Sequence, residues 1–217
     1  MNFELNAFFS FTVGIGAIIG WVKIKKIDPA FFPFLILLLT GFVHEVISWV
    51  IVHEGYSNAA TYNCFTLLES ILISWQFYKW GLFERVQRYY LLQLSFTVSW
   101  FAELWSRQSI HVFFSFFIVL YATVIVLMSI RLLGRVMFRE PGNILLQTEF
   151  LVCMGLTLYF TYTILIEVFW LYGLNKSVAF RLGIYEVFGY INLFTNFIFA
   201  FAAIWIPLKK RYILQSL

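Results

Sequence analysis

The chain has few charged residues and few cysteines, prolines and histidines. Charged residues make up 12% of the 217 positions and hydrophobic residues 62%, whereas charged residues are usually about a quarter of a soluble domain. A composition this apolar, with a mean hydropathy of +0.85, excludes a water-soluble globular fold. We therefore expect a multi-pass membrane protein whose main surroundings are the lipid bilayer.

The scarcity of cysteine removes any basis for a disulfide framework. Only two cysteines occur. Cys64 begins one apolar run, and Cys153 lies in the opposite half of another run, so a bridge would have to cross the depth of the bilayer. We expect two free thiols. A basic segment ahead of the first apolar run is also missing, so we expect this run to be a retained helix and not a cleaved signal peptide.

Seven long apolar runs account for most of the sequence. Their lengths are near the roughly 20 residues that a membrane-spanning helix needs. We expect an all-α, seven-transmembrane-helix bundle that forms a single membrane domain over residues 1–217. The expected helices are 5–22, 31–52, 63–82, 89–105, 111–133, 148–174 and 184–206.

The basic residues alternate between the connections of these runs. Three Lys or Arg residues lie in or beside each of the first, third and fifth connections, and three follow the last run, which makes twelve of the fifteen. Basic residues favour the cytoplasmic side of membrane proteins. We therefore expect the N-terminus outside and the C-terminus in the cytoplasm, in a plasma membrane such as the bacterial inner membrane. The bases form no continuous patch, so nucleic acid is not an expected partner.

Carboxyl groups gather at the opposite, outer ends of the helices. Five of the seven acids there lie within or close to the expected spans, one on each of five helices: Glu45, Glu69, Glu103, Glu167 and Glu186. Polar residues at helical spacing accompany them and place them toward the bundle interior. Carboxylates crowded in a low dielectric repel one another, so we expect them to hold a proton or a cation between them.

We interpret these residues as an outward-facing acidic pocket for a cation, an amine or a metal. The candidate binding residues are Glu45, Glu69, Glu103, Glu167, Glu186, His44, Asn192 and Asn196. The alternative is that acids at the helix ends only reach lipid headgroups or bond to neighbouring helices. This alternative applies most to Glu103 and Glu186, which lie nearest the edge, and least to the deeper Glu45 and Glu69.

The residue types also allow a divalent cation, although no cofactor is expected. His44, Glu45 and Glu69 would be its ligands, because borderline divalent ions accept imidazole and carboxylate together. The His44-Glu45 pair begins like the helix motif of zinc proteases, but Ser48 stands where the second histidine is needed. Since no nucleophile motif stands out either, we expect no enzymatic activity.

Seven spans with an external N-terminus resemble the topology of rhodopsin and the G-protein-coupled receptors. Glu84-Arg85-Val86, at the inner end of the third span, resembles the acid-Arg-aromatic triplet of those receptors. The last span, 184–206, has neither a lysine that could hold retinal nor an Asn-Pro-x-x-Tyr element. Retinal is therefore excluded as a cofactor, and descent from these receptors is not supported.

Two functions fit these features. The first is a seven-helix sensor or receptor-like accessory protein that detects an external ligand in the acidic pocket. Its inner loops are too short for an output domain, so the signal would pass to a membrane-bound partner such as a histidine kinase. The alternative is a small cation- or proton-coupled transporter or channel in which Asn192 and Asn196 continue the path inward. The sequence fixes neither the ligand nor the oligomeric state.

Overall fold

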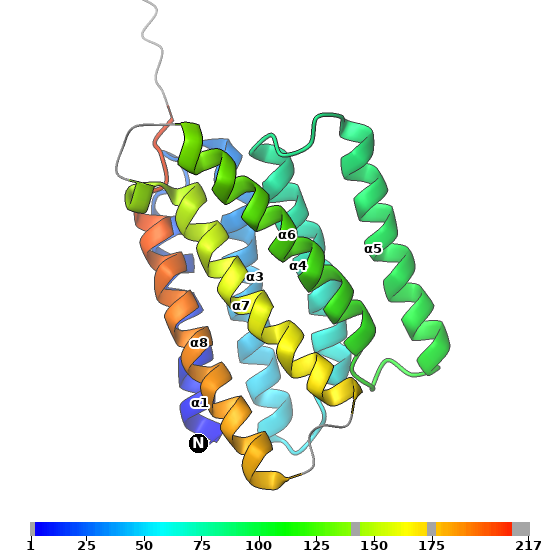
Figure 1. Ribbon diagram of the computed structural model, residues 1–217. Helices are drawn as coiled ribbons and strands as arrows, with labels where there is room; N and C mark the ends of the chain where they lie inside the picture. The colour runs from blue at the N-terminus through cyan, green and yellow to red at the C-terminus, as the bar shows by residue number, and fades with distance from the viewer. Residues whose placement is uncertain (1–2, 140–143, 173–176, 210–217) are drawn as a thin grey trace, which may run out of the picture.

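The structure, a computed structural model, is a bundle of long helices (Figure 1). It describes residues 3–139, 144–172 and 177–209. The predicted end of the sixth span at 173–174, and the bases Lys176, Lys210 and Arg211, lie outside the described residues. So do the side chains of Arg139 and Arg181, which belong to the charge pattern used for the topology.

The described part of the chain is all-helical and has no β-strands, which confirms the predicted all-α class. In chain order the α-helices are α1 (Phe3–Phe11), α2 (Val13–Val22), α3 (Phe32–His53), α4 (Ala59–Lys79), α5 (Val86–Arg107), α6 (Ser115–Arg139), α7 (Thr148–Leu171) and α8 (Val178–Ile204). The short 3-10 turns η1 (Pro29–Phe31) and η2 (Ile144–Leu146) precede α3 and α7. Only Thr12 separates α1 from α2, so these two form one interrupted rod.

Five segments of the described chain are long and apolar enough to cross a bilayer. They are Glu4–Val22, Pro29–His53, Ser115–Phe138, Thr148–Leu171 and Gly183–Ile204. α4 and α5 have similar lengths, 21 and 22 residues, but carry more polar side chains. The fold is therefore consistent with an integral membrane protein. The count of seven spans and their orientation stay predictions.

The contacts between helices form a ring that closes between the first and the last rod. α1 and α2 pack against α3 and α8, α3 against α4, α4 against α6, α6 against α7, and α7 against α8. α5 packs against α4 and α6 and stands at the edge of the bundle. Six rods thus surround a common interior, and α5 is attached to the outside.

Successive rods run in opposite directions, so the connections meet at two ends. The end where α2, α4, α6 and α8 finish carries Lys23, Lys79 and Arg135, and we call it the basic end; it is uppermost in Figure 1. Here Lys23 Nζ donates to Ile204 O at 3.2 Å and Arg135 donates to Gly81 O at 2.7 Å. The opposite end, where α1, α4, α6 and α8 begin, is the acidic end.

Glycines allow the closest contacts inside the ring. A Cβ added at Gly20 would overlap Leu35 Cδ2, and one at Gly155 would lie 2.6 Å from Phe199 Cε1. Side chains at these positions would push α2 away from α3 and α7 away from α8. The contact at Gly155 matters for the site, because it fixes the Phe199 ring in the middle of the bundle.

Candidate functional site

A polar cavity lies inside the ring, about midway between its two ends. Its volume is about 60 Å³, and α1, α2, α3, α4, α7 and α8 enclose it. The polar residues of its wall are Ser10, Glu45, Glu69, Tyr159, Asn192, Thr195 and Asn196. A void of this size has room for a few water molecules or a small ion, since one water occupies about 30 Å³ in the liquid.

Glu69 projects into this cavity from α4. Its side chain is buried, with 9% of the residue exposed, because Thr66, Glu69 and Ser70 share the inward face of the helix. Tyr121, on α6, donates its hydroxyl to Glu69 Oε2 at 2.8 Å. A neutral phenol cannot balance the charge of a buried carboxylate, so this group needs a proton or a cation from the cavity.

Glu45 enters the same cavity from α3. It is half-buried and hydrogen-bonded to Ser10 of α1. Ser10 Oγ accepts in turn from Asn192 Nδ2 at 3.0 Å, so a short chain of hydrogen bonds joins α8, α1 and α3 at the cavity wall. The charges of Glu45 and Glu69 repel each other. The two acids that the sequence placed deepest are therefore neighbours in one space.

Asn196 holds the break between α1 and α2 against α8. Its Nδ2 lies 3.1 Å from Thr12 Oγ1, 3.3 Å from Phe9 O and 3.4 Å from Ser10 O. Backbone carbonyls near such an interruption lack some of their usual helical partners, and a buried carbonyl without a partner costs free energy. The amide of Asn196 thus adds a donor at the interruption and joins it to α8.

Thr195 contributes a buried hydroxyl without a partner. Only 1% of the residue is exposed, and it lines the cavity. Among the described residues its Oγ1 makes no hydrogen bond. A buried polar atom left unpaired costs about 1–3 kcal/mol. A water molecule or an ion in the cavity would remove this cost.

His44 does not join the two carboxyls. It is buried one position before Glu45 on α3, and its ring lies parallel to that of Phe65, with centroids 4.3 Å apart. In the described part of the chain, no three His, Cys, Asp or Glu side chains are grouped so that they could hold a metal ion. The predicted metal ligands His44, Glu45 and Glu69 are thus not gathered around one point.

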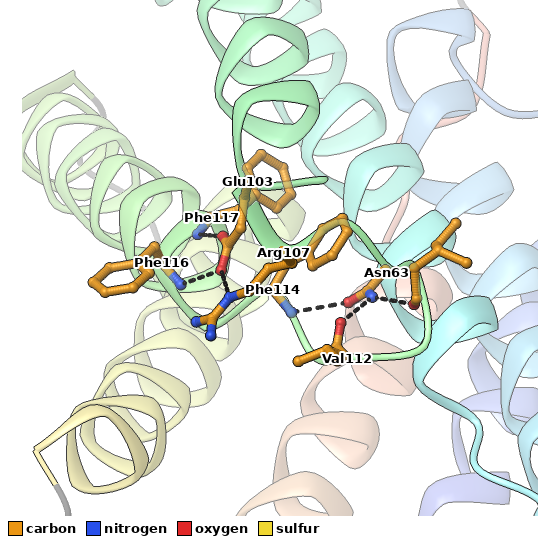
Figure 2. A network of polar contacts seen from close by, with 8 residues as sticks. Asn63, Glu103, Arg107, Val112, Phe114, Phe116 and Phe117 are labelled. Atoms are coloured by element: carbon orange, nitrogen blue, oxygen red, sulfur yellow. Dashed lines mark hydrogen bonds and ion pairs between the residues drawn. The ribbon is translucent and has the colours of Figure 1, made fainter. Parts of the chain in front are cut away.

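Glu103 caps a helix and does not line the cavity (Figure 2). Its Oε1 accepts from Phe116 N at 3.3 Å and its Oε2 from Phe117 N at 2.6 Å, in the first turn of α6. Arg107 Nε lies 3.5 Å from Oε1. A carboxylate at this place satisfies free backbone N–H groups and interacts favourably with the helix dipole. Its contacts correspond to the alternative stated above for acids near the edge, a bond to a neighbouring helix.

The remaining two acids lie apart from the cavity as well. Glu167 lines a second, larger pocket at the acidic end. Glu186 is half-buried on α8 and lines neither space. Of the eight predicted binding residues, the structure brings four to the interior cavity: Glu45, Glu69, Asn192 and Asn196.

Asn63 is an anchor that the sequence analysis did not single out (Figure 2). It is fully buried at 0% exposure. Its Nδ2 donates to Ile110 O at 2.8 Å and to Val112 O at 2.7 Å, and its Oδ1 accepts from Phe114 N at 3.1 Å. These bonds fix the connection between α5 and α6. The signal that could have pointed to it was an amide side chain at the very start of the apolar run 63–82.

Sequence reasoning missed two residues that line the cavity, Ser10 and Thr195, and Tyr121, which bonds to the cavity residue Glu69. Ser10 and Thr195 are single hydroxyls in strongly apolar runs, and Tyr121 is one of many aromatic residues. The spacing of the Asn192 and Asn196 pair could have drawn attention to Thr195, which lies directly beside Asn196. Tyr121 gave no signal, because nothing in α6 indicates which aromatic faces Glu69.

The geometry defines a class of protein: an apolar helical bundle, consistent with membrane insertion, that contains a small acidic cavity. No known protein family, curated protein or solved structure matches the chain.

Proposed function

We propose that the chain is a seven-span membrane sensor that binds a small cation in its interior cavity. The observation that carries the proposal is the pairing of Glu45 and Glu69, from two helices, beside the unpartnered hydroxyl of Thr195. Two carboxyls that share a small space in a low dielectric repel unless a proton or a metal ion lies between them. The cavity is of the right size for such an ion.

Seven spans are supported by how α4 and α5 place their polar groups. At about 1.5 Å per residue, 21 or 22 residues extend about 32 Å, enough for the hydrocarbon layer. On α4, the polar residues Asn63, Ser70, Ser74 and Gln76 are all buried inside the bundle. On α5, the Ser99 hydroxyl donates to its own helix at Ser95 O, at 2.7 Å. The named polar residues of α4 thus lie inside the bundle, and the hydroxyls of Ser95, Thr97 and Ser99 on α5 bond to their own helix.

The proposed orientation follows from the charges of the two ends. The basic end holds the described bases of three connections, and cytoplasmic loops of membrane proteins are enriched in Lys and Arg. The acidic end would then face away from the cytoplasm. In a plasma membrane the cavity, which lies midway along the bundle, would then sample the outside through the acidic end.

A sensor is favoured over a carrier by the residues beneath the cavity. On the side of the basic end, Leu38 and Phe199 form its floor, and the Phe34 ring lies edge-on to Phe199 with centroids 5.7 Å apart. All three residues are buried. An ion that left its carboxyl ligands for this apolar layer would lose its solvation. The arrangement fits binding without passage.

The route of a signal is proposed from the contacts of the first rod. The cavity touches α1 at Ser10, and the same rod ends at the basic end, where Lys23 donates to Ile204 O of α8. An ion that changed the hydrogen bonds of Ser10 would bias the position of this rod. Because the described connections at the basic end are short, a partner protein would carry the output.

A small cation- or proton-coupled transporter is the second candidate. The interruption at Thr12 favours it, because transporters often bind ions beside a spanning helix that is broken. In this reading the Phe199 layer would open in another conformation. Both candidate functions use the same cavity, and they differ in whether the bound ion crosses the membrane.

The binding step is tested by cation- and pH-dependent stability in lipid nanodiscs. Wild-type protein, Glu45→Gln and Glu69→Gln are unfolded by heat at fixed ionic strength, with Na⁺, K⁺ or Ca²⁺ exchanged for choline and with pH varied from 5 to 8. We expect one of these cations to raise the unfolding temperature of the wild-type protein more than the others do. Glu45→Gln and Glu69→Gln should each remove this rise, and the control variant Glu186→Gln should retain it. Equal responses in all four proteins would refute the cavity as the site.

The choice between sensor and transporter is tested by flux. The protein is reconstituted into proteoliposomes, and uptake of the stabilising cation and of protons is followed under imposed gradients. No flux above that of empty liposomes is expected for a sensor. Uptake that Glu69→Gln abolishes would establish the transporter instead.

A further inference from the structure

A second, larger pocket opens at the acidic end. Its volume is about 710 Å³, and it is lined by α4, α6, α7 and α8 together with residues beside and within the α5–α6 connection. Pockets that bind small organic molecules usually have volumes of about 300–1,000 Å³. This pocket is therefore of a size for an organic ligand, whereas the interior cavity admits only water or an ion.

Aromatic rings form much of its wall. They belong to Tyr62, Phe113, Phe116, Trp170, Tyr185 and Phe188. Contacts among the rings fix some of them in place: Tyr62 and Phe113 meet edge to face with centroids 5.5 Å apart, and Trp170 Nε1 donates to the Tyr185 hydroxyl at 2.7 Å. The face of an aromatic ring is negative, so fixed rings of this kind attract an organic cation as well as an apolar group.

The carboxyl of Glu167 gives this pocket a negative charge. It is hydrogen-bonded to Ser115, and no ion pair joins it to a base within the described ranges. Arg107 also lines the pocket, but its Nε lies 3.5 Å from Glu103 Oε1, and its guanidinium carbon is 5.7 Å from the centre of the Phe116 ring. Since Arg107 already has an anionic partner, the charge left to be matched is that of Glu167.

The two spaces lie in series along the bundle. We call the larger pocket the outer pocket. On α7, Thr163 lines the outer pocket, and Tyr159, one turn away, lines the interior cavity. On α8, Phe188 lines the outer pocket and Asn192 lines the interior cavity. The rings of Tyr159 and Phe188 meet between the two spaces, with centroids 5.6 Å apart. The outer pocket is thus a separate compartment above a layer of rings.

We infer that the outer pocket binds a hydrophobic organic ammonium ion, with its charged nitrogen at Glu167 and its apolar body among the rings. An inorganic cation would leave most of the 710 Å³ unfilled. A lipid or detergent chain would contact the rings but gain nothing from the carboxyl. The site is distinct from the small-cation site proposed above and does not depend on it.

The experiment compares a charged and a neutral probe of the same shape. Binding of phenethylammonium and of 2-phenylethanol to the full chain in lipid nanodiscs is measured by calorimetry at pH 7. We expect phenethylammonium to bind wild-type protein about tenfold or more tightly, which corresponds to about 1.4 kcal/mol. In Glu167→Gln the two probes should bind alike. Trp170→Ala should weaken both, because it removes a ring that either probe contacts.

Two control variants separate this inference from the proposed function. Glu186→Gln changes an acid on α8 that does not line the pocket, and Glu69→Gln changes the interior cavity. Both should keep the tenfold preference for the ammonium probe, even if no cation binds inside. Three results would overturn the inference. The preference for the ammonium probe could persist in Glu167→Gln, both probes could bind wild type equally, or binding could be seen in detergent but not in nanodiscs. The last result would assign the pocket to lipid.

Discussion

Replacing Glu103 with alanine should destabilise the bundle more than any single surface charge would. The substitution removes two acceptors from the first turn of α6 and the partner of Arg107. Loss of a helix cap costs about 1 kcal/mol and up to about 2 kcal/mol, and a hydrogen bond to a charged group contributes about 1.5–3 kcal/mol. Since the Glu103 side chain is only 6% exposed, water cannot replace the lost acceptors well. We expect a loss of about 3 kcal/mol in the free energy of unfolding.

Two further variants show which contact matters. Glu103→Gln keeps one side-chain oxygen that can accept from the N–H groups of α6, and it should lower the free energy of unfolding by about 1 kcal/mol. Arg107→Ala removes the ion-pair partner of Glu103 and a contact with the Phe116 ring. The Arg107 side chain is 35% exposed and its Nε lies 3.5 Å from the carboxylate, so this variant should lose less than about 1 kcal/mol of unfolding free energy. Reversible unfolding in mixed micelles, followed by circular dichroism, measures all three. The reasoning fails if Glu103→Ala lies within about 0.5 kcal/mol of wild type, or if Arg107→Ala costs as much.

Three other changes test the packing around the site by the same unfolding assay. Asn63→Ala leaves three backbone groups of the α5–α6 connection without their partner and should cost about 2–4 kcal/mol; a change below about 1 kcal/mol would contradict this. Tyr121→Phe removes the hydroxyl that donates to the Glu69 carboxyl and should lower the free energy of unfolding by about 1.5 kcal/mol. An unchanged free energy of unfolding would show that this hydrogen bond is absent. Gly155→Ala places a Cβ 2.6 Å from the Phe199 ring and should cost about 1–3 kcal/mol, whereas Gly134→Ala, with nothing within 4 Å, should be neutral or stabilising. Equal effects of the two alanines would contradict the close contact.

The all-helical fold and the inward direction of Glu45 and Glu69 could be predicted from the sequence, because each depends on the pattern of residues within one helix. Apolar runs of spanning length predict helices, and polar residues at helical spacing predict the face that turns from lipid. Glu45 and Glu69 share a cavity for this reason: each sits in the inward stripe of its own helix. The run at 5–22 concealed the interruption at Thr12, because nothing in its composition differs from that of a continuous helix.

The roles of individual acids could not be predicted, because they depend on which group of another helix lies opposite. The sequence placed Glu103 nearer the edge than Glu69, but it could not show that Glu103 meets the free N–H groups of α6 or that Glu69 meets the Tyr121 hydroxyl. The placement of α5 outside the ring decides this difference. Likewise, Glu167 lies within three turns of Tyr159 on α7 but lines a different space.

A double-mutant cycle on Glu45 and Glu69 tests the central claim most directly. The shift in unfolding temperature on addition of the stabilising cation is measured for wild type, Glu45→Gln, Glu69→Gln and the double variant. If both carboxyls hold the same ion, either substitution alone removes most of the shift and the second adds little, so the effects are strongly non-additive. Additive effects, with each single variant keeping about half of the shift, would show that the two groups act at separate places and contradict a shared cation site.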